Sequence, residues 1–152
     1  YKVRNEILNL RYPVVREKKL KVKCFGNFEV FSDNVPLKFA RSKTKEFFAY
    51  MVDRQGAVLN TNQLCAVLWE NEADSESVKS QFRVLVADLK TALKRVNAEE
   101  VFITARNSFS INTELIDCDY YRYIKGQNIK FENEYMVQYS WAELKNAELA
   151  IK

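Results

Sequence analysis

The spacing of hydrophobic positions changes several times along this chain, and each change marks a different expected element. The longest regular run lies in residues 74–95, where apolar side chains recur every three or four positions and predict one amphipathic helix. Either Asp74 or Ser75 can cap its start, and Asp74 and Glu76 suit the positive end of the helix dipole. The apolar stripe of this helix consists of Val78, Phe82, Val86, Leu89 and Leu93.

Two shorter helices are expected before the long one. Residues 42–55 form the first, with Ser42 as a candidate cap and Gly56 just past its end. Residues 61–69 form the second, where Asn60 and Gln63 have the spacing of a capping box. The expected core-facing residues of the two helices are Phe47, Phe48, Met51, Val52, Leu64, Cys65, Val67, Leu68 and Trp69.

Alternating apolar and polar positions on both sides of this helical region predict strands. Residues 19–39 read as three short strands joined by turn-forming residues, which is a small antiparallel meander. Residues 57–59 form a short extended piece. Residues 101–112 alternate again around the turn Arg106-Asn107-Ser108 and predict a β-hairpin.

Helices are also expected at both ends of the chain. Residues 1–15 read as a linker helix that Pro13 stops, with a disordered tail as the alternative. After residue 114 the chain is rich in aromatic residues. A first helix there can begin at Asp117 or Asp119 and end at Gly126, and a second runs from Tyr135 to Ile151. So many aromatic side chains suggest that this pair packs against the rest of the domain or a further segment.

Composition narrows the classes of function. The 152 residues contain three well-separated cysteines and no histidine, which removes the commonest metal ligand and every histidine-based catalytic triad. No glycine-rich phosphate loop or nucleophile motif is visible. We therefore expect a binding protein and not an enzyme, with no cofactor, metal or small-molecule substrate. The odd, scattered cysteines suggest buried thiols in a reducing, cytoplasmic setting, and no run of residues is long and apolar enough to cross a membrane.

Charge adds two surfaces to this picture. The net charge is only +4, but residues 16–54 hold ten Lys or Arg against five Asp or Glu, whereas residues 70–76 hold four acids and no base. The long helix carries a face of small side chains opposite its apolar stripe, and a basic flank beside it. Such a helix can lie in a nucleic-acid groove, although an ordinary core helix with a solvated back has the same pattern.

Three motifs follow one another along the chain: KTKEFFAYMVDRQGAVLNTNQLCAVLW at 43–69, FRVLVADLKTAL at 82–93 and TARNSFSI at 104–111. Together with the order of elements, they resemble the winged-helix output domain of OmpR/PhoB-type response regulators, in the branch shared with the SARP activators. EYMVQYSWAEL at 134–144 resembles the start of the bacterial transcriptional activation domain (BTAD) of SARP-like proteins. NEILNLRYP at 5–13 is similar to the linker that leaves a receiver domain.

The resemblance implies an α+β fold: a winged helix-turn-helix with an N-terminal antiparallel β-meander, a three-helix core and a C-terminal β-hairpin wing, followed by a helix pair. The expected parts are a linker helix at 1–15, a winged-helix DNA-binding domain at 16–113, and a C-terminal helical extension at 114–152 that begins a BTAD-like domain. The implied function is a transcriptional regulator of a two-component system that binds double-stranded DNA, with a homodimer on DNA as one arrangement.

The same resemblance assigns roles to individual residues. Helix 75–95 would enter the major groove and the hairpin 101–112 would contact the DNA backbone or minor groove. The acidic turn would face away from DNA and could meet RNA polymerase, or it is a solvated turn without a partner; its residues are Glu70, Glu72, Asp74 and Glu76. The expected DNA-binding residues are Ser80, Arg83, Val84, Ala87, Lys79, Lys90, Lys43, Asn62, Trp69, Arg106 and Asn107.

This chain departs from the family pattern in ways that keep a second function open. The family's Arg-Leu-Arg appears here as Asp88-Leu89-Lys90. Ala87 stands where the family usually has a polar residue, and the wing lacks the family's glycines. Asp88 would repel phosphate if it faced DNA. The alternative is therefore a protein–protein interaction module on a winged-helix scaffold, with weak or no DNA binding.

Overall fold

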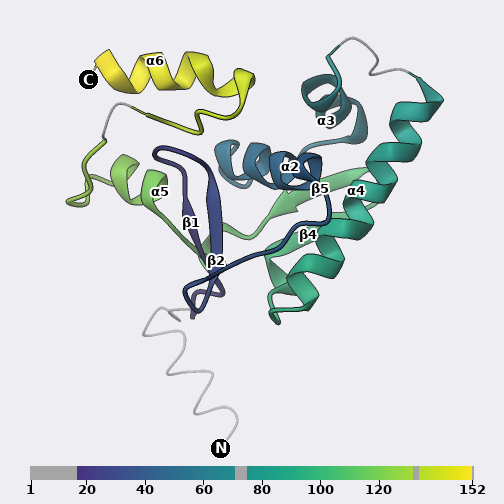
Figure 1. Cartoon of the computed structure of the whole chain (residues 1–152), viewed down its shortest axis with the longest axis horizontal. Coiled ribbons are helices and arrows are strands. Elements are labelled where there is room, and N and C mark those ends of the chain that lie inside the picture. Colours follow the sequence, from purple (N-terminus) through teal and green to yellow (C-terminus); the bar gives the residue numbers. More distant parts are fainter. Residues whose placement is uncertain (1–16, 71–74, 132–133, 152) are drawn as a thin grey trace, which may run out of the picture.

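A four-stranded sheet lies at the N-terminal end of the fold, in the order β3-β2-β1-β6. The computed structural model describes residues 17–70, 75–131 and 134–151 (Figure 1). Strands β1 (Leu20–Lys23), β2 (Glu29–Ser32) and β3 (Val35–Pro36) pair antiparallel in sequence order. Side chains of β1 alternate between buried and exposed, as a strand with one face on a core requires. The meander expected in residues 19–39 is therefore present.

The fourth strand of this sheet was not expected from the sequence. Strand β6 (Ile116–Cys118) lies parallel to β1, with Val22 opposite Cys118. The segment after residue 113 was expected to be helical, but it first adds an edge to the N-terminal sheet. A parallel pairing needs a long crossover, and here all three central helices and the hairpin lie between the two strands.

Three helices follow the meander: α2 (Ser42–Asp53), α3 (Thr61–Leu68) and α4 (Glu76–Lys94). Their caps match the sequence in two cases. Asn60 and Gln63 form the expected capping box on α3, and Ser75 caps α4 by accepting the N–H of Val78 at 3.1 Å. Ser42 was wrong as a cap, because Arg41 is the N-cap of α2 and makes no side-chain capping bond.

The buried side of α4 is wider than the expected stripe. Val78, Phe82, Leu89 and Leu93 are buried as expected, whereas Val86 is only half-buried. Leu85 and Ala92, which the stripe left out, are buried as well. The reason is that α4 packs against both α2 and α3, so its contact surface extends around one side of the expected stripe.

The hairpin follows α4 after a short 3₁₀ turn. Strands β4 (Phe102–Ala105) and β5 (Ser108–Ile111) pair antiparallel, with Ala105 opposite Ser108 across a two-residue tip. The extended piece at 57–59 lies against β5 of the hairpin, where the backbones of Leu59 and Phe109 form an antiparallel bridge with hydrogen bonds of 2.9 and 2.8 Å. The hairpin is thus anchored to the loop that precedes α3.

The C-terminal part contains α5 (Asp119–Ile124) and α6 (Glu143–Ile151). The second helix was expected to begin at Tyr135, but that boundary was wrong: a 3₁₀ turn at Ser140–Ala142 leads into α6. Residue 135 lies in a bridge to Phe25, and the amide of Met136 donates to the carbonyl of Cys24 at 2.8 Å. These backbone bonds with the first strand's end compete with the helical conformation.

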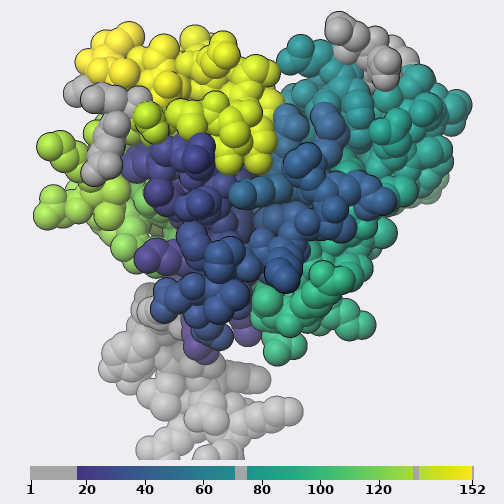
Figure 2. All heavy atoms as spheres, in the orientation of Figure 1, coloured from purple at the N-terminus to yellow at the C-terminus, as the bar shows by residue number. Residues whose placement is uncertain are grey.

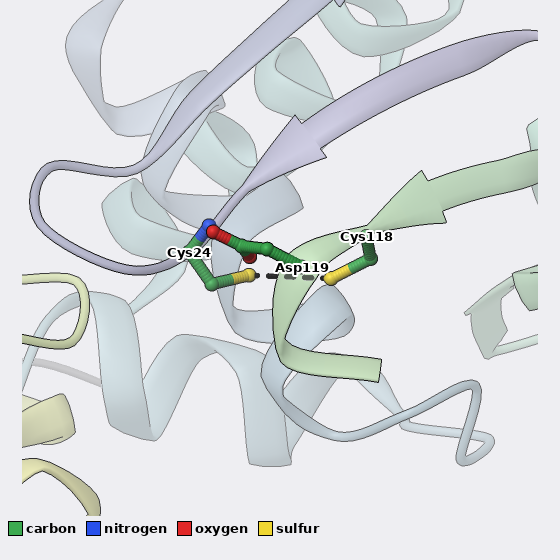
Figure 3. A group of neighbouring side chains, drawn as sticks. All are labelled: Cys24, Cys118 and Asp119. Carbon is green, nitrogen blue, oxygen red and sulfur yellow. Dashed lines mark hydrogen bonds between the residues drawn. The ribbon is translucent and has the colours of Figure 1, made fainter. Parts of the chain in front are cut away.

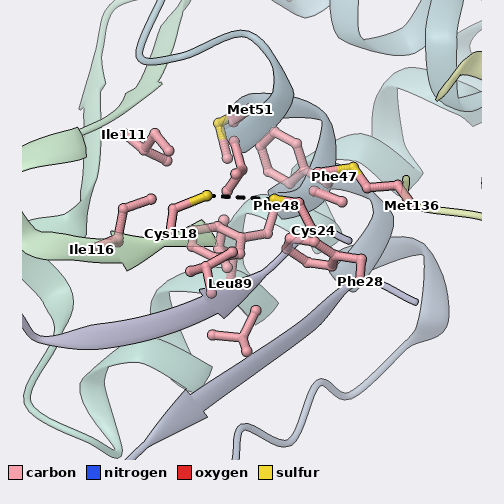
Figure 4. Packing of buried hydrophobic residues seen from close by; sticks show 14 of the residues in the cluster. Cys24, Phe28, Phe47, Phe48, Met51, Leu89, Ile111, Ile116, Cys118 and Met136 are labelled. Atoms are coloured by element: carbon pink, nitrogen blue, oxygen red, sulfur yellow. Dashed lines mark hydrogen bonds between the residues drawn. The ribbon is translucent and has the colours of Figure 1, made fainter. Parts of the chain in front are cut away.

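One hydrophobic cluster joins the sheet, the central helices, the hairpin and the C-terminal part. It includes Val22 from the sheet, Phe47 from α2, Leu89 from α4, Ile111 from the hairpin and Met136 from the C-terminal part. Figure 4 shows Phe47, Leu89, Ile111 and Met136 among the side chains of this cluster. The three cysteines are free and buried in or beside this core, as expected of thiols used as small hydrophobic residues. The arrangement is a mixed α+β fold compatible with a winged helix.

Different elements lie on the two sides of α2. Figure 1 shows α4 along one side of the molecule and α5 and α6 on the opposite side, with α2 between them. In Figure 2 the yellow C-terminal segment forms the upper flank of the molecule on one side, while α3 and α4 form the other flank. The expected linker helix at 1–15 lies outside the described residues, as do Glu72 and Asp74.

Candidate nucleic-acid interface

The outward side of α4 carries most of the residues expected to meet DNA. Ser80, Arg83, Val84, Ala87 and Lys90 are all exposed, and they follow one another at helical spacing. Their order around the helix puts the small and apolar residues in the middle and the cations on one flank. This flank consists of Lys79, which is half-buried, and the exposed Arg83, Lys90 and Lys94.

The basic flank of α4 borders an open hollow of about 340 Å³ between α4, the start of α3 and the hairpin. Its apolar wall includes Phe82 and Phe109, whose ring centroids lie 5.2 Å apart. The hollow is lined by Thr61, Lys79, Phe82, Arg83, Val86, Asn107 and Phe109. The structure therefore brings Lys79, Arg83 and Asn107, three of the expected DNA-binding residues, together around one hollow. Thr61 and Phe109 were missed, because the pairing of the hairpin with the 57–61 segment leaves no local signal.

The tip of the hairpin is held by an internal hydrogen bond. Asn107 has a φ of +48°, a left-handed conformation that asparagine tolerates better than most residues. Its side-chain oxygen accepts the backbone N–H of Thr61, in the first turn of α3, at 3.0 Å. Asn107 therefore fixes the hairpin against α3, and its neighbour Arg106 is exposed at the tip.

Arg83 is partly ordered by its own helix. Its guanidinium donates to the hydroxyl of Ser80 one turn earlier, at 3.0 Å. A guanidinium has five N–H donors, so this bond leaves others for an anion or a base edge. The hydrogen bond holds the side chain along the exposed surface of α4, which reduces the entropy that a bound ligand would have to remove.

Asp88 does not face the exposed side of α4. Its carboxylate forms an ion pair with Arg41, the residue that precedes α2. The hydroxyl of Thr44, which is fully buried, also donates to this carboxylate at 3.4 Å. Asp88 therefore links α4 to the start of α2, and Arg41 neutralises its charge. Asp88 would repel phosphate only if its side chain pointed to the exposed side of α4, and it points towards the start of α2 instead.

Lys43 and Trp69 meet at the far end of α3. The ammonium of Lys43 donates to the carbonyl of Leu68 at 2.6 Å and lies 5.2 Å from the centroid of the Trp69 ring. It is also 3.7 Å from Glu46. A cation at a helix C-terminus offsets the negative end of the helix dipole. These contacts tie the partly exposed side chain of Lys43 to the end of α3, whereas Asn62 is exposed in the first turn of α3.

The acidic turn is only partly described. Glu70 and Glu76 are exposed on either side of it, and no ion pair involves them among the described residues. Residues 71–74, which include Glu72 and Asp74, lie outside the described part of the chain.

A second group of chemically reactive side chains lies outside the hollow beside α4. Figure 3 shows Cys24, Cys118 and Asp119 together, where β1 ends and α5 begins, with the two sulfur atoms 3.5 Å apart. The carboxylate of Asp119 already accepts the backbone N–H groups of Cys24, Phe25 and Tyr120 at 2.7, 3.1 and 2.7 Å.

Metal binding at this group would require thiolates and free carboxylate oxygens. Burial and the hydrogen bond with Cys118 raise the pKa of the Cys24 thiol, so its protonated form is favoured. Since the Asp119 oxygens are satisfied by backbone donors, we interpret the cluster as a structural junction. It ties the end of β1 to the start of α5.

In the described part of the chain, no helix has the length and apolar character needed to span a membrane.

Comparison with known proteins adds information about the fold. No family model and no curated protein matches this chain. The solved structures that it resembles include Mycobacterium tuberculosis EmbR in complex with a low-affinity phosphopeptide, with a TM-score of 0.60 and 20% identity. The similarity covers 72% of this chain but only 29% of the EmbR chain, so the described fold spans less than a third of that protein.

Proposed function

We propose that this chain is a DNA-binding domain of a transcriptional regulator, built as a winged helix-turn-helix. Helix α4 enters the major groove, and the hairpin β4–β5 lies on the adjacent backbone or in the minor groove. The observation that carries this proposal is the continuous exposed surface of α4 with its basic flank, which borders a hollow shared with the hairpin. Nucleic-acid binding needs such a combination of cations and a protruding element that fits a groove.

Each exposed residue has a role in this proposal. Ser80, Val84 and Ala87 face base edges, while Arg83 reaches a base edge or a phosphate. Lys79 and Lys90 neutralise phosphates on the flank of α4. Asn62 and Arg106 approach the backbone from the start of α3 and from the hairpin tip. Asn107 acts through its bond to Thr61, as a positioning residue for the hairpin.

The structural likeness supports the coarser part of this proposal. The likeness to the EmbR structure supports the fold assumed in this proposal, a SARP-like winged-helix domain. Membership of an OmpR/PhoB-type response regulator, control by a two-component system, and a following BTAD-like domain are further parts of the proposal, which rest on the sequence resemblance. We also propose that the domain binds without catalysis and acts in the cytoplasm. Homodimer formation on DNA and contact of the acidic turn with RNA polymerase belong to the same proposal.

Binding should be measured by fluorescence anisotropy with random-sequence duplexes and with duplexes from the gene's own promoter, across a series of salt concentrations. We expect binding that weakens steeply as salt rises, because cations on α4 release counterions from DNA. Replacing Arg83 or Arg106 with alanine should lower the affinity, and loss of one phosphate contact should reduce the slope of log K against log salt by about 1.

The matched control is Arg54→Ala. Arg54 is an exposed arginine that follows Asp53 at the end of α2, on the side where α6 docks. This variant should bind DNA as the unchanged chain does. Absence of binding at low salt, or an equal loss with Arg54→Ala, would refute the proposed interface.

A second function is favoured by one specific observation. The outer side of α6 exposes Leu144 at 72% and Ile151 at 86% of their surface, and Val137 before the helix is 48% exposed. Exposed apolar side chains grouped on one helix are typical of a protein-binding surface. If the DNA experiment fails, a protein–protein interaction module on this scaffold is the function to test, with Leu144→Ser as the variant that should weaken partner binding.

A further inference from the structure

Val84 is an unusual residue for the position it occupies. Among the described residues of α2, α3 and α4, it is the only large apolar side chain that is exposed, at 42% of its surface. It lies near the middle of α4, on the side opposite the buried Phe82. A β-branched residue in an exposed helix interior is a weaker helix former than alanine, leucine or lysine. Folding therefore gains little from valine here, and its apolar surface is free for a ligand.

The surroundings of Val84 suit DNA better than a protein surface. Arg83 beside it and Lys79, Lys90 and Lys94 supply four positive charges along one flank of the helix, and all of them except the half-buried Lys79 are exposed. Asp88, the one acid of α4 after Glu76, is paired with Arg41. The site therefore combines an apolar centre with a basic border, which complements a polyanion that carries apolar groups in its groove.

The DNA major groove offers one apolar group, the 5-methyl of thymine. Side chains such as alanine, threonine and phenylalanine recognise it through apolar contact, without hydrogen bonds. Two exposed neighbours of Val84 one turn away, Ser80 and Ala87, are short, and a third, Gln81, bonds back to the hydroxyl of Ser77, so the isopropyl group can protrude. Arg83 and the exposed Gln81 are the side chains near this point that can bond a base edge in bidentate fashion, and apolar contact at Val84 adds a separate means of discrimination.

We propose that Val84 is a specificity-determining residue that reads thymine methyl groups in the major groove. This inference rests on the proposed function, since it assumes that α4 enters that groove. The preferred sites then contain a thymine at the step that faces the centre of α4. Ala87, one turn further along, extends the same apolar contact.

The test uses deoxyuridine, which differs from thymidine in this context by the absence of the 5-methyl group. The whole chain selects its preferred duplex from a random-sequence pool, and each thymine in that duplex is then replaced singly by deoxyuridine. At one or two positions we expect the affinity of the unchanged chain to fall about three- to fourfold, as for the loss of one buried methyl group. The variant Val84→Ala should bind the thymine duplex less tightly and lose its sensitivity at those same positions.

Val35→Ala is the matched control, because Val35 is an exposed valine on β3, in the N-terminal sheet. It should keep the full pattern of thymine sensitivity. If every thymine position gives the same affinity ratio in the unchanged chain and in Val84→Ala, the methyl-reading role is refuted. Salt-dependent binding that is lost in Arg83→Ala would then still support the proposed function. Failure of any duplex to bind at low salt would overturn both.

Discussion

At the scale of single residues, Asp88 shows that the sign of a charge says little until its direction is known. Its side chain is 18% exposed and pairs with Arg41, while the buried hydroxyl of Thr44 donates to the same carboxylate. A sequence pattern gives the face of a helix but not the partner that a neighbouring element brings to it. Asp88 is thus a link between α4 and α2, and its charge counts little against DNA binding.

This geometry predicts the effect of Asp88→Ala. The variant should be less stable by about 1 kcal/mol, because it removes an ion pair and leaves the hydroxyl of the buried Thr44 without its carboxylate acceptor. Its affinity for DNA and the salt dependence of that affinity should stay nearly unchanged. Urea denaturation measures the first quantity and anisotropy the second. A large gain in DNA affinity would contradict the prediction, since it would mean that Asp88 faces the bound phosphates.

Asn107 combines a left-handed backbone with a side-chain hydrogen bond, and two substitutions separate these contributions. Asn107→Gly keeps the backbone conformation and should lose about 1 kcal/mol with the bond to Thr61. Asn107→Ala loses the same bond and adds the strain of a positive φ, about 1 kcal/mol more. Chemical denaturation should rank the unchanged chain above the glycine variant, and the glycine variant above the alanine variant.

Hydrogen exchange gives a local check on the same prediction. The amide of Thr61 should exchange faster in both variants, because its acceptor is removed. Unchanged protection of this amide in Asn107→Ala would show that another group holds the start of α3, and it would remove Asn107 from its positioning role.

At the scale of elements, local patterns predicted what depends on local chemistry. The stripe of α4 predicts its buried side because the period of a helix is fixed, and the capping box of α3 follows from residues three positions apart. The hairpin follows from alternation around a turn whose second residue tolerates a positive φ. Each of these features is set within a few residues of the chain.

Elements that depend on distant partners were missed. Strand β6 has only three residues, and its pairing with β1 joins positions almost a hundred residues apart. The stretch from Tyr135 has helical spacing, yet its backbone pairs with residues near Phe25 instead. In the candidate site, the exposed side of α4 was predictable, whereas the internal roles of Lys43 and Asn107 were not. These roles arise where the end of one helix meets a residue from another element.

The docking of the C-terminal segment on α2 has a consequence at alkaline pH. The hydroxyl of Tyr135 donates to the buried carboxylate of Asp53 at 2.6 Å, and Lys145 lies 2.8 Å from the same carboxylate. Burial, followed by the nearby Cys24 and Asp53, raises the pKa of Tyr135 far above its ordinary 10.0. Burial alone would lower the pKa of Lys145, but the hydrogen bond and charge of Asp53 raise it overall.

The direction of the pH dependence follows from whether the folded or the unfolded chain binds these protons more tightly. In the folded chain both groups keep their protons above pH 10, whereas an unfolded chain releases them near their ordinary values. Stability from these groups is therefore complete below pH 10 and falls as pH rises beyond it. Each tyrosine that stays protonated only when folded contributes a slope of about 1.4 kcal/mol per pH unit.

Tyr135→Phe should accordingly show two effects. Near pH 7 it should be less stable by about 1–2 kcal/mol, because the buried Asp53 loses a donor. Between pH 10 and 12 its stability should fall less steeply than that of the unchanged chain. Denaturant titrations at several pH values measure both. Identical alkaline slopes in the two proteins would contradict the assignment of this pH dependence to Tyr135.

At the scale of the whole molecule, the two flanks of α2 have different tasks. On one side α3, α4 and the hairpin build the candidate DNA surface. On the other, the C-terminal segment donates from Trp141 to Glu46 at 2.9 Å and exchanges two hydrogen bonds between Gln138 and the backbone of Phe28. Figure 2 shows the C-terminal segment closing over this part of the molecule. The segment thus completes the core on which the DNA surface rests.

This arrangement predicts that a chain ending at residue 113 will not fold cooperatively. Such a chain lacks β6, which pairs with β1, and loses Ile116, Tyr121 and Tyr135 from the hydrophobic cluster. The remaining sheet would expose the buried faces of Leu20 and Val22 to water. Exposing a large apolar side chain costs about 1.5–3 kcal/mol. The sum over several such side chains is comparable to the whole free energy of unfolding of a domain of this size.

Circular dichroism during urea denaturation tests this prediction, with Ile151→Ser in the whole chain as the control. Ile151 is 86% exposed, so this variant should unfold cooperatively at nearly the same urea concentration as the unchanged chain. The shortened chain should give a broad, shallow transition and no salt-dependent DNA binding. If it instead unfolds in one sharp step and binds DNA, residues 16–113 are an independent domain and the C-terminal segment is an addition to it. A loss of folding would mean that the DNA surface depends on contacts made on the opposite side of α2.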